Sequence, residues 1–303
     1  GIEACRKLCG GHGYSQASGL PEISNNYLAL CTLEGTQQVL EPQTARFILR
    51  GVAALHAAGG GGVAYSEKGA EVYAHYTSYL TMSEAEGMEA VNALHGSSDE
   101  PTVQLAVLGL RAKTLALDVA MSLHKAVEGG VAEKAAFGGM GIALGKLTRA
   151  HSQWVLLRDV VNGVADLQAS RGTAHGGATR LGGADLAALS TLAGLMGAVL
   201  LEEAVADLCA FGLMDGSGAK AIEAKVDELS VRLTPDAIAL VDGWGFDDAH
   251  LGYSAIGSYD GDVYRRLFDY AQQEPLNADP DGTITPSYKQ HLARLVGRPW
   301  SKL

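Results

Sequence analysis

The chain has 303 residues, 47% hydrophobic and 19% charged, the profile of a globular protein that can bury a sizeable core. Its formal net charge of −11 argues against a nucleic-acid-binding protein and against docking on an anionic membrane, since both need basic surfaces and no Lys/Arg run is present. Four scattered cysteines are too few for a disulfide scaffold, which favours a reducing compartment.

The first residues, GIEACRKLCGGHGY, predict a helix that ends at two glycines. Ile2, Cys5 and Cys9 recur at helical spacing, so we expect them to share one buried face, with Gly10 and Gly11 ending the helix. The chain begins with Gly, not Met, and begins inside this helix, which indicates a C-terminal piece of a longer protein.

A metal site is the alternative interpretation of this stretch. It would use Cys5, Cys9 and His12, with Cys31 as a distant fourth ligand, but no second closely spaced pair completes a zinc pattern, so we predict none. The glycines at 10, 11 and 13 do not form G-x-G-x-x-G and follow no strand, which excludes the dinucleotide fingerprint. They still permit a ligand to approach the backbone closely.

The stretch CTLEGTQQVLEPQTARFILR, residues 31 to 50, places one carboxylate at an apolar-to-polar junction. Glu34 follows Leu33 and precedes Gly35, and a helical pattern comes next. One interpretation is an acid at a helix N-terminus, where the dipole favours negative charge. The other is a general base that is partly desolvated, with its pKa raised towards neutrality.

Helical periodicity dominates the remainder, and strand signals are scarce. Residues 102 to 127 place Val107, Leu110, Leu117 and Met121 on one face. The other predicted helices span 146 to 167, with Leu147, Trp154, Leu157 and Val161 on one face, 220 to 233 and 262 to 273. His124 and His151 fall within helical patterns and are predicted to be ordinary surface or core residues.

The most apolar stretch covers residues 186 to 201, which is shorter than the roughly 20 residues that span a bilayer. Glu202 and Glu203 close it, so we predict a buried packing helix and no membrane span. The acidic turn at Asp279 fails as a calcium loop, because its twelfth position is Gln290.

These patterns predict an all-α protein with breaks at 58 to 62, 95 to 101, 170 to 183 and 277 to 286. We expect a first helical domain that ends with residues 1–58, a linker with a connecting helix at 59–100, and a second helical domain at 101–303.

Three stretches of the chain carry recognisable motifs. The first 50 residues contain a C-G-G-H-G-Y helix end, then Glu-Gly, then a Q-T-A-R helix. Residues 234 to 277 contain A-L-V-D and Y-D-G-D-V-Y elements, and AHSQWVLLRDVV lies between the two segments. In this order the motifs resemble those of the peroxisomal acyl-CoA oxidases, with residues 234 to 277 similar to the terminal helical domain of that family and AHSQWVLLRDVV a weaker match.

The resemblance implies a reaction in which Glu34 removes the α-proton of a fatty acyl-CoA while a hydride passes to FAD. The product is a trans-2-enoyl-CoA, and O₂ becomes hydrogen peroxide. It implies that the Glu34 backbone N–H polarises the thioester carbonyl and that Gly35 leaves room for the acyl chain.

The same resemblance assigns FAD contacts to Thr36 and Gln38 and, across the subunit contact of a homodimer, to Cys9, Gly10 and Gly11. The sequence departs from the family at three places. Leu33 stands where Tyr or Phe precedes Glu, GTQQ is closer to the related dehydrogenases, and Pro42 should kink its helix or delay its start.

Ser301-Lys302-Leu303 resembles the tripeptide that a peroxisomal import receptor reads. Alone, this piece is predicted to be inactive, because the missing part would hold most flavin and CoA contacts. Two other interpretations stay open: a dehydrogenase-like flavoprotein that passes electrons to a partner, and a non-catalytic helical assembly subunit.

Overall fold

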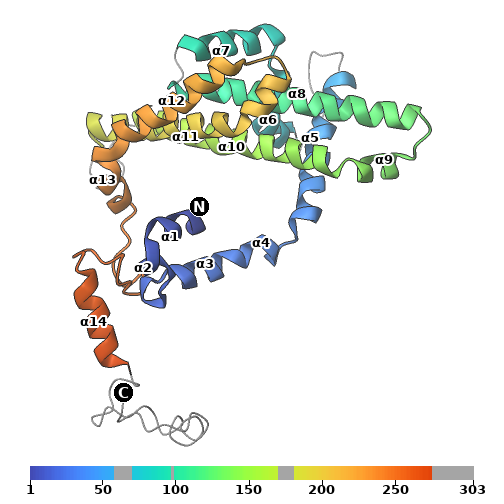
Figure 1. The fold of residues 1–303 in the computed structure, drawn as a ribbon. Helices are drawn as coiled ribbons and strands as arrows, with labels where there is room; N and C mark the ends of the chain where they lie inside the picture. Colours follow the sequence, from blue (N-terminus) through green and yellow to red (C-terminus); the bar gives the residue numbers. More distant parts are fainter. Residues whose placement is uncertain (58–69, 97–98, 170–180, 275–303) are drawn as a thin grey trace, which may run out of the picture. The chain divides into compact units, whose positions relative to one another are not determined.

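The computed structural model describes residues 1–57, 70–96, 99–169 and 181–274. All of the regular secondary structure in those ranges is helical, which confirms the predicted all-α fold (Figure 1). The helices are α1 Ile2–Leu8, α2 Gly10–Tyr14, η1 Gln16–Ser18, α3 Leu20–Leu28, α4 Leu30–Leu33, α5 Gln37–Ala57, α6 Ala70–Thr77, η2 Ser78–Thr81, α7 Glu84–Gly96, α8 Pro101–Glu128, α9 Glu133–Gly139, α10 Gly141–Ala169, α11 Gly183–Ala210, α12 Gly216–Leu233, η4 Thr234–Asp236, α13 Ala237–Asp242 and α14 Val263–Gln273.

Contacts between residues group the chain into two compact units. Of the described residues, the small unit contains 1–35 and 240–274, and the large unit contains those between 36 and 239. The division expected at residues 58 and 100 stays a prediction.

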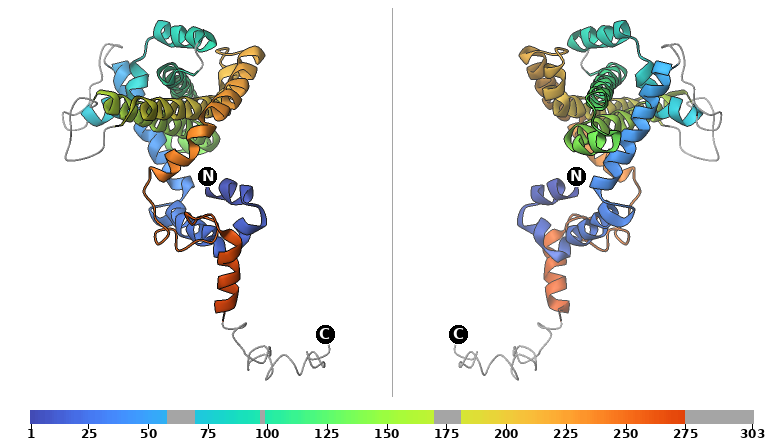
Figure 2. Two further views of the ribbon diagram at one scale, coloured as in Figure 1. Left: turned by 90° about the vertical axis from the view of Figure 1, so that its left-hand side faces the viewer. Right: turned by 90° about the vertical axis from the view of Figure 1, so that its right-hand side faces the viewer.

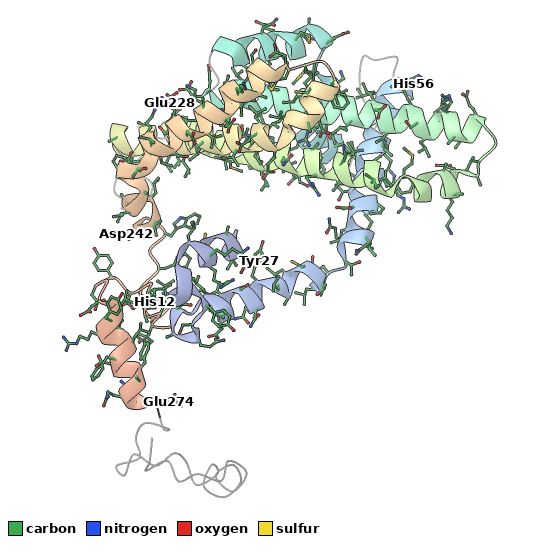
Figure 3. All side chains as sticks on the ribbon, viewed as in Figure 1. His12, Tyr27, His56, Glu228, Asp242 and Glu274 are labelled. Atoms are coloured by element: carbon green, nitrogen blue, oxygen red, sulfur yellow. The ribbon has the colours of Figure 1, made fainter. Side chains whose placement is uncertain are left out.

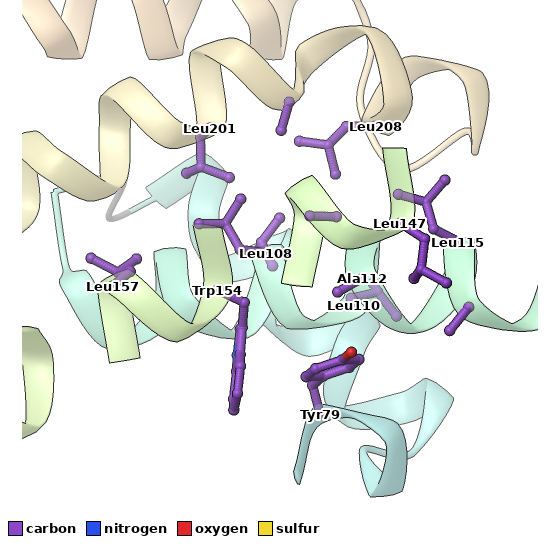
Figure 4. Close-up of a cluster of buried hydrophobic side chains, with 14 of the residues drawn as sticks. Tyr79, Leu108, Leu110, Ala112, Leu115, Leu147, Trp154, Leu157, Leu201 and Leu208 are labelled. Atoms are coloured by element: carbon purple, nitrogen blue, oxygen red, sulfur yellow. The ribbon is translucent and has the colours of Figure 1, made fainter. Parts of the chain in front are cut away.

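The core of the large unit lies among α8, α10 and α11, which pack against one another (Figures 1 and 2). Leu108, Leu147, Leu157, Leu201 and Leu208 come from these three helices and are fully buried (Figure 4). Burying one such side chain contributes about 1.5–3 kcal/mol, so this leucine layer is a main source of the unit's stability.

Helices α8 and α10 contain the stretches predicted from periodicity at 102 to 127 and 146 to 167. The predicted face of α10 is confirmed, since Leu147, Trp154 and Leu157 are buried. The predicted face of α8 is only half right. Val107 and Leu110 are buried, but Leu117 is 40% exposed and Met121 is 64% exposed, so the predicted face is covered only in its first half.

Helix α11 is confirmed as the packing helix predicted at 186 to 201. By length and composition alone it could cross a membrane, but it packs against α8, α10 and α12. Its small residues allow close approach: a Cβ at Gly197 would lie 1.9 Å from Oε1 of the buried Gln104 of α8.

A buried polar network joins α8, α10 and α11. The Arg111 guanidinium is 4% exposed and donates to Asp207 Oδ2 from Nε at 2.9 Å and Nη2 at 2.7 Å. Its Nη1 donates to Gln153 Oε1 at 2.5 Å, and Gln153 Nε2 donates to Glu203 Oε2 at 2.7 Å. The charge on Arg111 is therefore compensated inside the core.

The small unit consists of two chain segments, which are joined by backbone and side-chain hydrogen bonds. The Ala255 N–H donates to the Ala17 carbonyl at 2.7 Å, and the Ser254 hydroxyl donates to the Ser18 carbonyl. Helix α14, predicted at 262 to 273, begins after Asp262, whose side chain accepts the Arg265 N–H. The two chain segments of this unit are thus hydrogen-bonded to each other through the loop before α14.

Candidate functional site

The Glu34 junction separates two helices. Helix α4 ends at Leu33, and Glu34 is its C-terminal cap, with φ −110° and ψ 12°. Helix α5 begins at Gln37, and the Thr36 carbonyl accepts its first N–H bonds, from Val39 at 2.9 Å and Leu40 at 3.0 Å.

This geometry decides one alternative left open by the sequence. The first turn of α5 contains no acidic residue, so Glu34 is not the helix-N-terminal acid of the first interpretation. As the C-terminal cap of α4 it lies at the end where the helix dipole disfavours negative charge. The interpretation of Glu34 as an acid in the first turn of a helix therefore does not hold.

Gly35 has a backbone reason to be glycine. Its φ is 131°, in a region that residues with a Cβ rarely adopt. A side chain here would strain the turn between Glu34 and Thr36, in addition to any crowding of a ligand.

The predicted desolvation of Glu34 is wrong for this chain taken by itself. Glu34 is exposed, and the neighbouring Leu33 is 71% exposed, because the side chains of the small unit leave both open to solvent. Any apolar cover over this carboxylate must come from outside the small unit.

The corner at Cys9, where α1 meets α2, differs from the simple helix end that the sequence predicted. Helix α1 stops at Leu8, and Gly10, with φ 58°, turns the chain directly into α2, so Gly10 and Gly11 open a second helix. Cys5 and Cys9 are exposed, so the prediction of buried cysteines is wrong. The neighbouring helices α2 and α3 leave the side chains of Cys5 and Cys9 open to solvent.

This corner leaves its backbone accessible. Cys9, Gly10 and Gly11 are exposed, and a Cβ at either glycine would meet no described atom within 4 Å. Gly13 differs, because a Cβ there would lie 2.2 Å from the Arg6 carbonyl oxygen, so glycine is required where α2 folds back on α1.

The other residues around this corner do not form a metal site. Within the described ranges, no three His, Cys, Asp or Glu side chains are grouped closely enough to hold a metal ion. His12, labelled in Figure 3, instead makes an edge contact with Tyr264 of α14, with ring centroids 5.9 Å apart.

Thr36 and Gln38, the other predicted cofactor contacts, lie at the beginning of the large unit. Both are exposed, and the structure gives neither side chain a hydrogen bond within the described part of the chain. The predicted site residues are therefore divided between the two units.

Helix α5 runs from Gln37 through Pro42, so the proline does not delay the start of the helix. Ala45 and Ile48 are fully buried and anchor α5 in the large unit. The tail Ser301-Lys302-Leu303 and the Asp279 turn lie outside the described residues.

Two adjoining grooves in the large unit were missed by the sequence reasoning. They have volumes of about 650 and 580 Å³ and share Val52, His56 and Leu117. Met121 lines one of them and Lys113 the other. The available sequence signal was the length of the α8 apolar stripe, which continues to Leu117 and Met121.

The two histidines singled out in the sequence behave as predicted. His124 lies on the surface, with its Nε2 3.2 Å from Glu128 Oε1. His151 is buried, and its Nδ1 lies 3.1 Å from the Tyr79 hydroxyl. Burial, with a smaller contribution from Arg158, lowers the pKa of His151 to about 4, so it is neutral at physiological pH.

Comparison with known proteins gives two family matches. The family model described as acyl-CoA oxidase matches residues 100–297, and the acyl-CoA oxidase C-alpha1 domain matches residues 1–49. The bovine peroxisomal acyl-coenzyme A oxidase 1 is 30% identical over 98% of this chain and 41% of its own length. The Arabidopsis thaliana peroxisomal acyl-coenzyme A oxidase 1 is 31% identical over 96% of this chain and 39% of its own length.

Solved structures agree with these matches. Arabidopsis thaliana acyl-CoA oxidase 1 superposes with a TM-score of 0.72 at 28% identity, over 98% of this chain and 40% of that one. The Caenorhabditis elegans acyl-CoA oxidase-1, complexed with FAD and ATP, has a TM-score of 0.80 at 24% identity, over 99% of this chain and 41% of that one. The chain thus spans about two fifths of the length of the relatives it matches.

Proposed function

The chain belongs to the acyl-CoA oxidase family, and from this premise we propose that it is the C-terminal part of a peroxisomal enzyme that oxidises fatty acyl-CoA to trans-2-enoyl-CoA. The observation that carries the proposal is the Glu34-Gly35 junction. An acid forms the C-terminal cap of α4, next to a glycine whose φ of 131° holds an unusual turn.

Glu34 is proposed as the general base. Its carboxylate removes the α-proton of the thioester, and this proton is acidic enough only if the thioester carbonyl is polarised as negative charge develops on its oxygen. The backbone N–H of Glu34 is proposed as one donor to that oxygen. Gly35 keeps the adjoining space free for the acyl chain.

FAD, when bound, supplies the acceptor for the hydride that leaves the β-carbon, and O₂ takes up the electrons to give hydrogen peroxide. Thr36 and Gln38 are proposed to approach it from the start of α5. Cys9, Gly10 and Gly11 are proposed to contact it across a homodimer, supported by their exposed backbone.

The exposure of Glu34 has a direct consequence for activity. A carboxylate open to water is a weak base towards a thioester α-proton, so the remaining part of the intact protein must exclude water from it. We therefore expect the 303-residue chain alone to be inactive.

The test uses the full-length protein with FAD bound. Glu34→Gln should retain FAD, because the side chain keeps its size, while anaerobic flavin bleaching by acyl-CoA falls by about 10²–10⁴-fold. Glu22→Gln, at an exposed acid of α3, is the matched control and should bleach normally. A Glu34→Gln variant that bleaches at the wild-type rate would refute the assignment.

Aerobic turnover separates an oxidase from a dehydrogenase-like flavoprotein. The wild-type protein should release hydrogen peroxide with each acyl-CoA oxidised and should need no partner flavoprotein. Retained FAD with neither bleaching nor peroxide would instead favour a non-catalytic assembly subunit.

Peroxisomal location is proposed from the Ser301-Lys302-Leu303 tail and from the peroxisomal names of the relatives. In a fusion that ends at Leu303, the free carboxylate and the Lys302 charge are groups that an import receptor can bind. Residues 290–303 fused to a fluorescent reporter should enter peroxisomes, and the same fusion without Leu303 should stay in the cytosol. A complete fusion that remains cytosolic would contradict the location.

A further inference from the structure

The first turn of α5 lacks one intrahelical hydrogen bond, because Pro42 lies inside the helix. Pro42 has no N–H, so the Gln38 carbonyl one turn earlier loses its usual intrahelical donor. Glu41, which precedes the proline, is held in a helical conformation that the proline ring disfavours. The first turn of α5 therefore has less support from its own helix than an ordinary first turn.

Helix α10 supplies support from outside. The Thr148 hydroxyl donates to the Glu41 carbonyl oxygen at 3.0 Å, at the peptide that joins Glu41 to Pro42. Gly145, one turn earlier on α10, leaves room for the Glu41 carboxylate, because a Cβ there would lie 2.9 Å from its Oε2. The other carboxylate oxygen accepts Gln37 Nε2 at 2.6 Å. Glu41 is thus fixed through its backbone and its side chain.

We infer that Thr148 is a positioning residue for the flavin-facing end of α5. The inference rests on the proposed function, in which Thr36 and Gln38 approach FAD and Glu34 is the base two residues before Thr36. Thr148 touches none of these groups. It acts by holding the Glu41 peptide, which sets the direction in which the chain enters α5.

If Thr148 supports the segment that Pro42 weakens, the effects of changing these two residues should be coupled. If Thr148 compensates for the proline, then its hydroxyl matters only while the proline is present. Pro42→Ala restores the missing N–H and removes the ring, so the helix can hold its first turn without help. A hydroxyl with an unrelated structural role would have the same effect in both backgrounds.

The experiment compares five variants of the full-length holoprotein: Thr148→Val, Thr148→Ser, Pro42→Ala, the double variant Thr148→Val with Pro42→Ala, and the control Thr114→Val. Thr114 is also partly buried, but its hydroxyl donates to Leu110 of its own helix at 2.9 Å. The measurements are the rate constant of anaerobic flavin bleaching, the acyl-CoA concentration at half-maximal rate, and hydrogen exchange of the amides at 39–41.

Thr148→Val should lower the bleaching rate constant about tenfold, the scale expected when reacting groups are slightly misplaced, with little change in the half-maximal concentration. Exchange at 39–41 should become faster. Thr148→Ser, which keeps the hydroxyl, and Thr114→Val should behave as wild type. With Pro42→Ala present, Thr148→Val should lower the rate no more than about twofold, because the two sites are coupled.

Two results would overturn the inference: unchanged bleaching and unchanged exchange in Thr148→Val, or an equal loss in both backgrounds. A wild-type holoprotein that does not bleach refutes the proposed function instead. In that case hydrogen exchange at 39–41 still decides whether Thr148 supports the first turn of α5.

Discussion

Removing Asp207 should leave the Arg111 guanidinium charged and unpaired inside the large unit. The side chains of Arg111 and Asp207 are 4% and 13% exposed, and two guanidinium nitrogens donate to Asp207 Oδ2. Breaking a buried ion pair by removing one partner costs about 3–5 kcal/mol, because the remaining charge keeps its desolvation penalty. We expect that loss for Asp207→Ala.

The assay is hydrogen exchange of α8 and α10 peptides in the full-length protein, which reports opening of this unit alone. Since 1.4 kcal/mol is a factor of ten, Asp207→Ala should lower protection by about a hundredfold or more. Glu228→Ala is the control, because its ion pair with Lys225, at 2.6 Å, lies on the surface and should matter little (Figure 3).

The double variant Arg111→Met with Asp207→Leu tests the reason for the loss. It removes both charges and fills the space with apolar side chains, so it should be more stable than Asp207→Ala alone. If the double variant is as unstable as the sum of its single changes, the loss comes from packing and not from an uncompensated charge, and the reasoning fails.

Three further predictions follow from described features. Gly197→Ala should destabilise the large unit by about 1–3 kcal/mol through overpacking against Gln104, measured as lost exchange protection in α8 and α11. The pKa of His151 falls from 6.5 to about 4 on folding, so the unfolded chain binds more protons than the folded chain between those pH values. The contribution of His151 to the stability of the large unit should therefore be complete above about pH 6.5 and decrease as the pH falls towards about 4. His151→Asn should flatten this pH dependence, measured by hydrogen exchange. The intact holoprotein should elute as a homodimer on size-exclusion chromatography, and a monomer with full FAD occupancy would contradict the proposed shared site.

Local pattern predicted the long helices well. Leu147, Trp154 and Leu157 recur at helical spacing, and α10 buries all three because a helix so patterned can pack against neighbours on one side. The same reasoning failed for Leu117 and Met121. Periodicity states which residues share a face, but not how far along that face the neighbouring helices extend.

Long-range pairing was beyond the sequence. Arg111 and Asp207 lie 96 positions apart, and nothing local to either residue indicates the other. The Glu34-Gly35 motif was found by resemblance, yet the φ of 131° at Gly35 and the cap position of Glu34 depend on how two helices meet. The exposure of Cys5 and Cys9 was missed because helical spacing identifies a face and not its partner.

Helix α11 has a consequence for synthesis of the protein on the ribosome. By length and composition alone, this segment resembles one that could cross a membrane. Helices α8 and α10 precede it, so surfaces that bury it have been made before it emerges, and α12 follows after the short segment 211–215. The order of the helices along the chain therefore shortens the time during which this apolar segment is exposed to the cell's insertion and quality-control machinery.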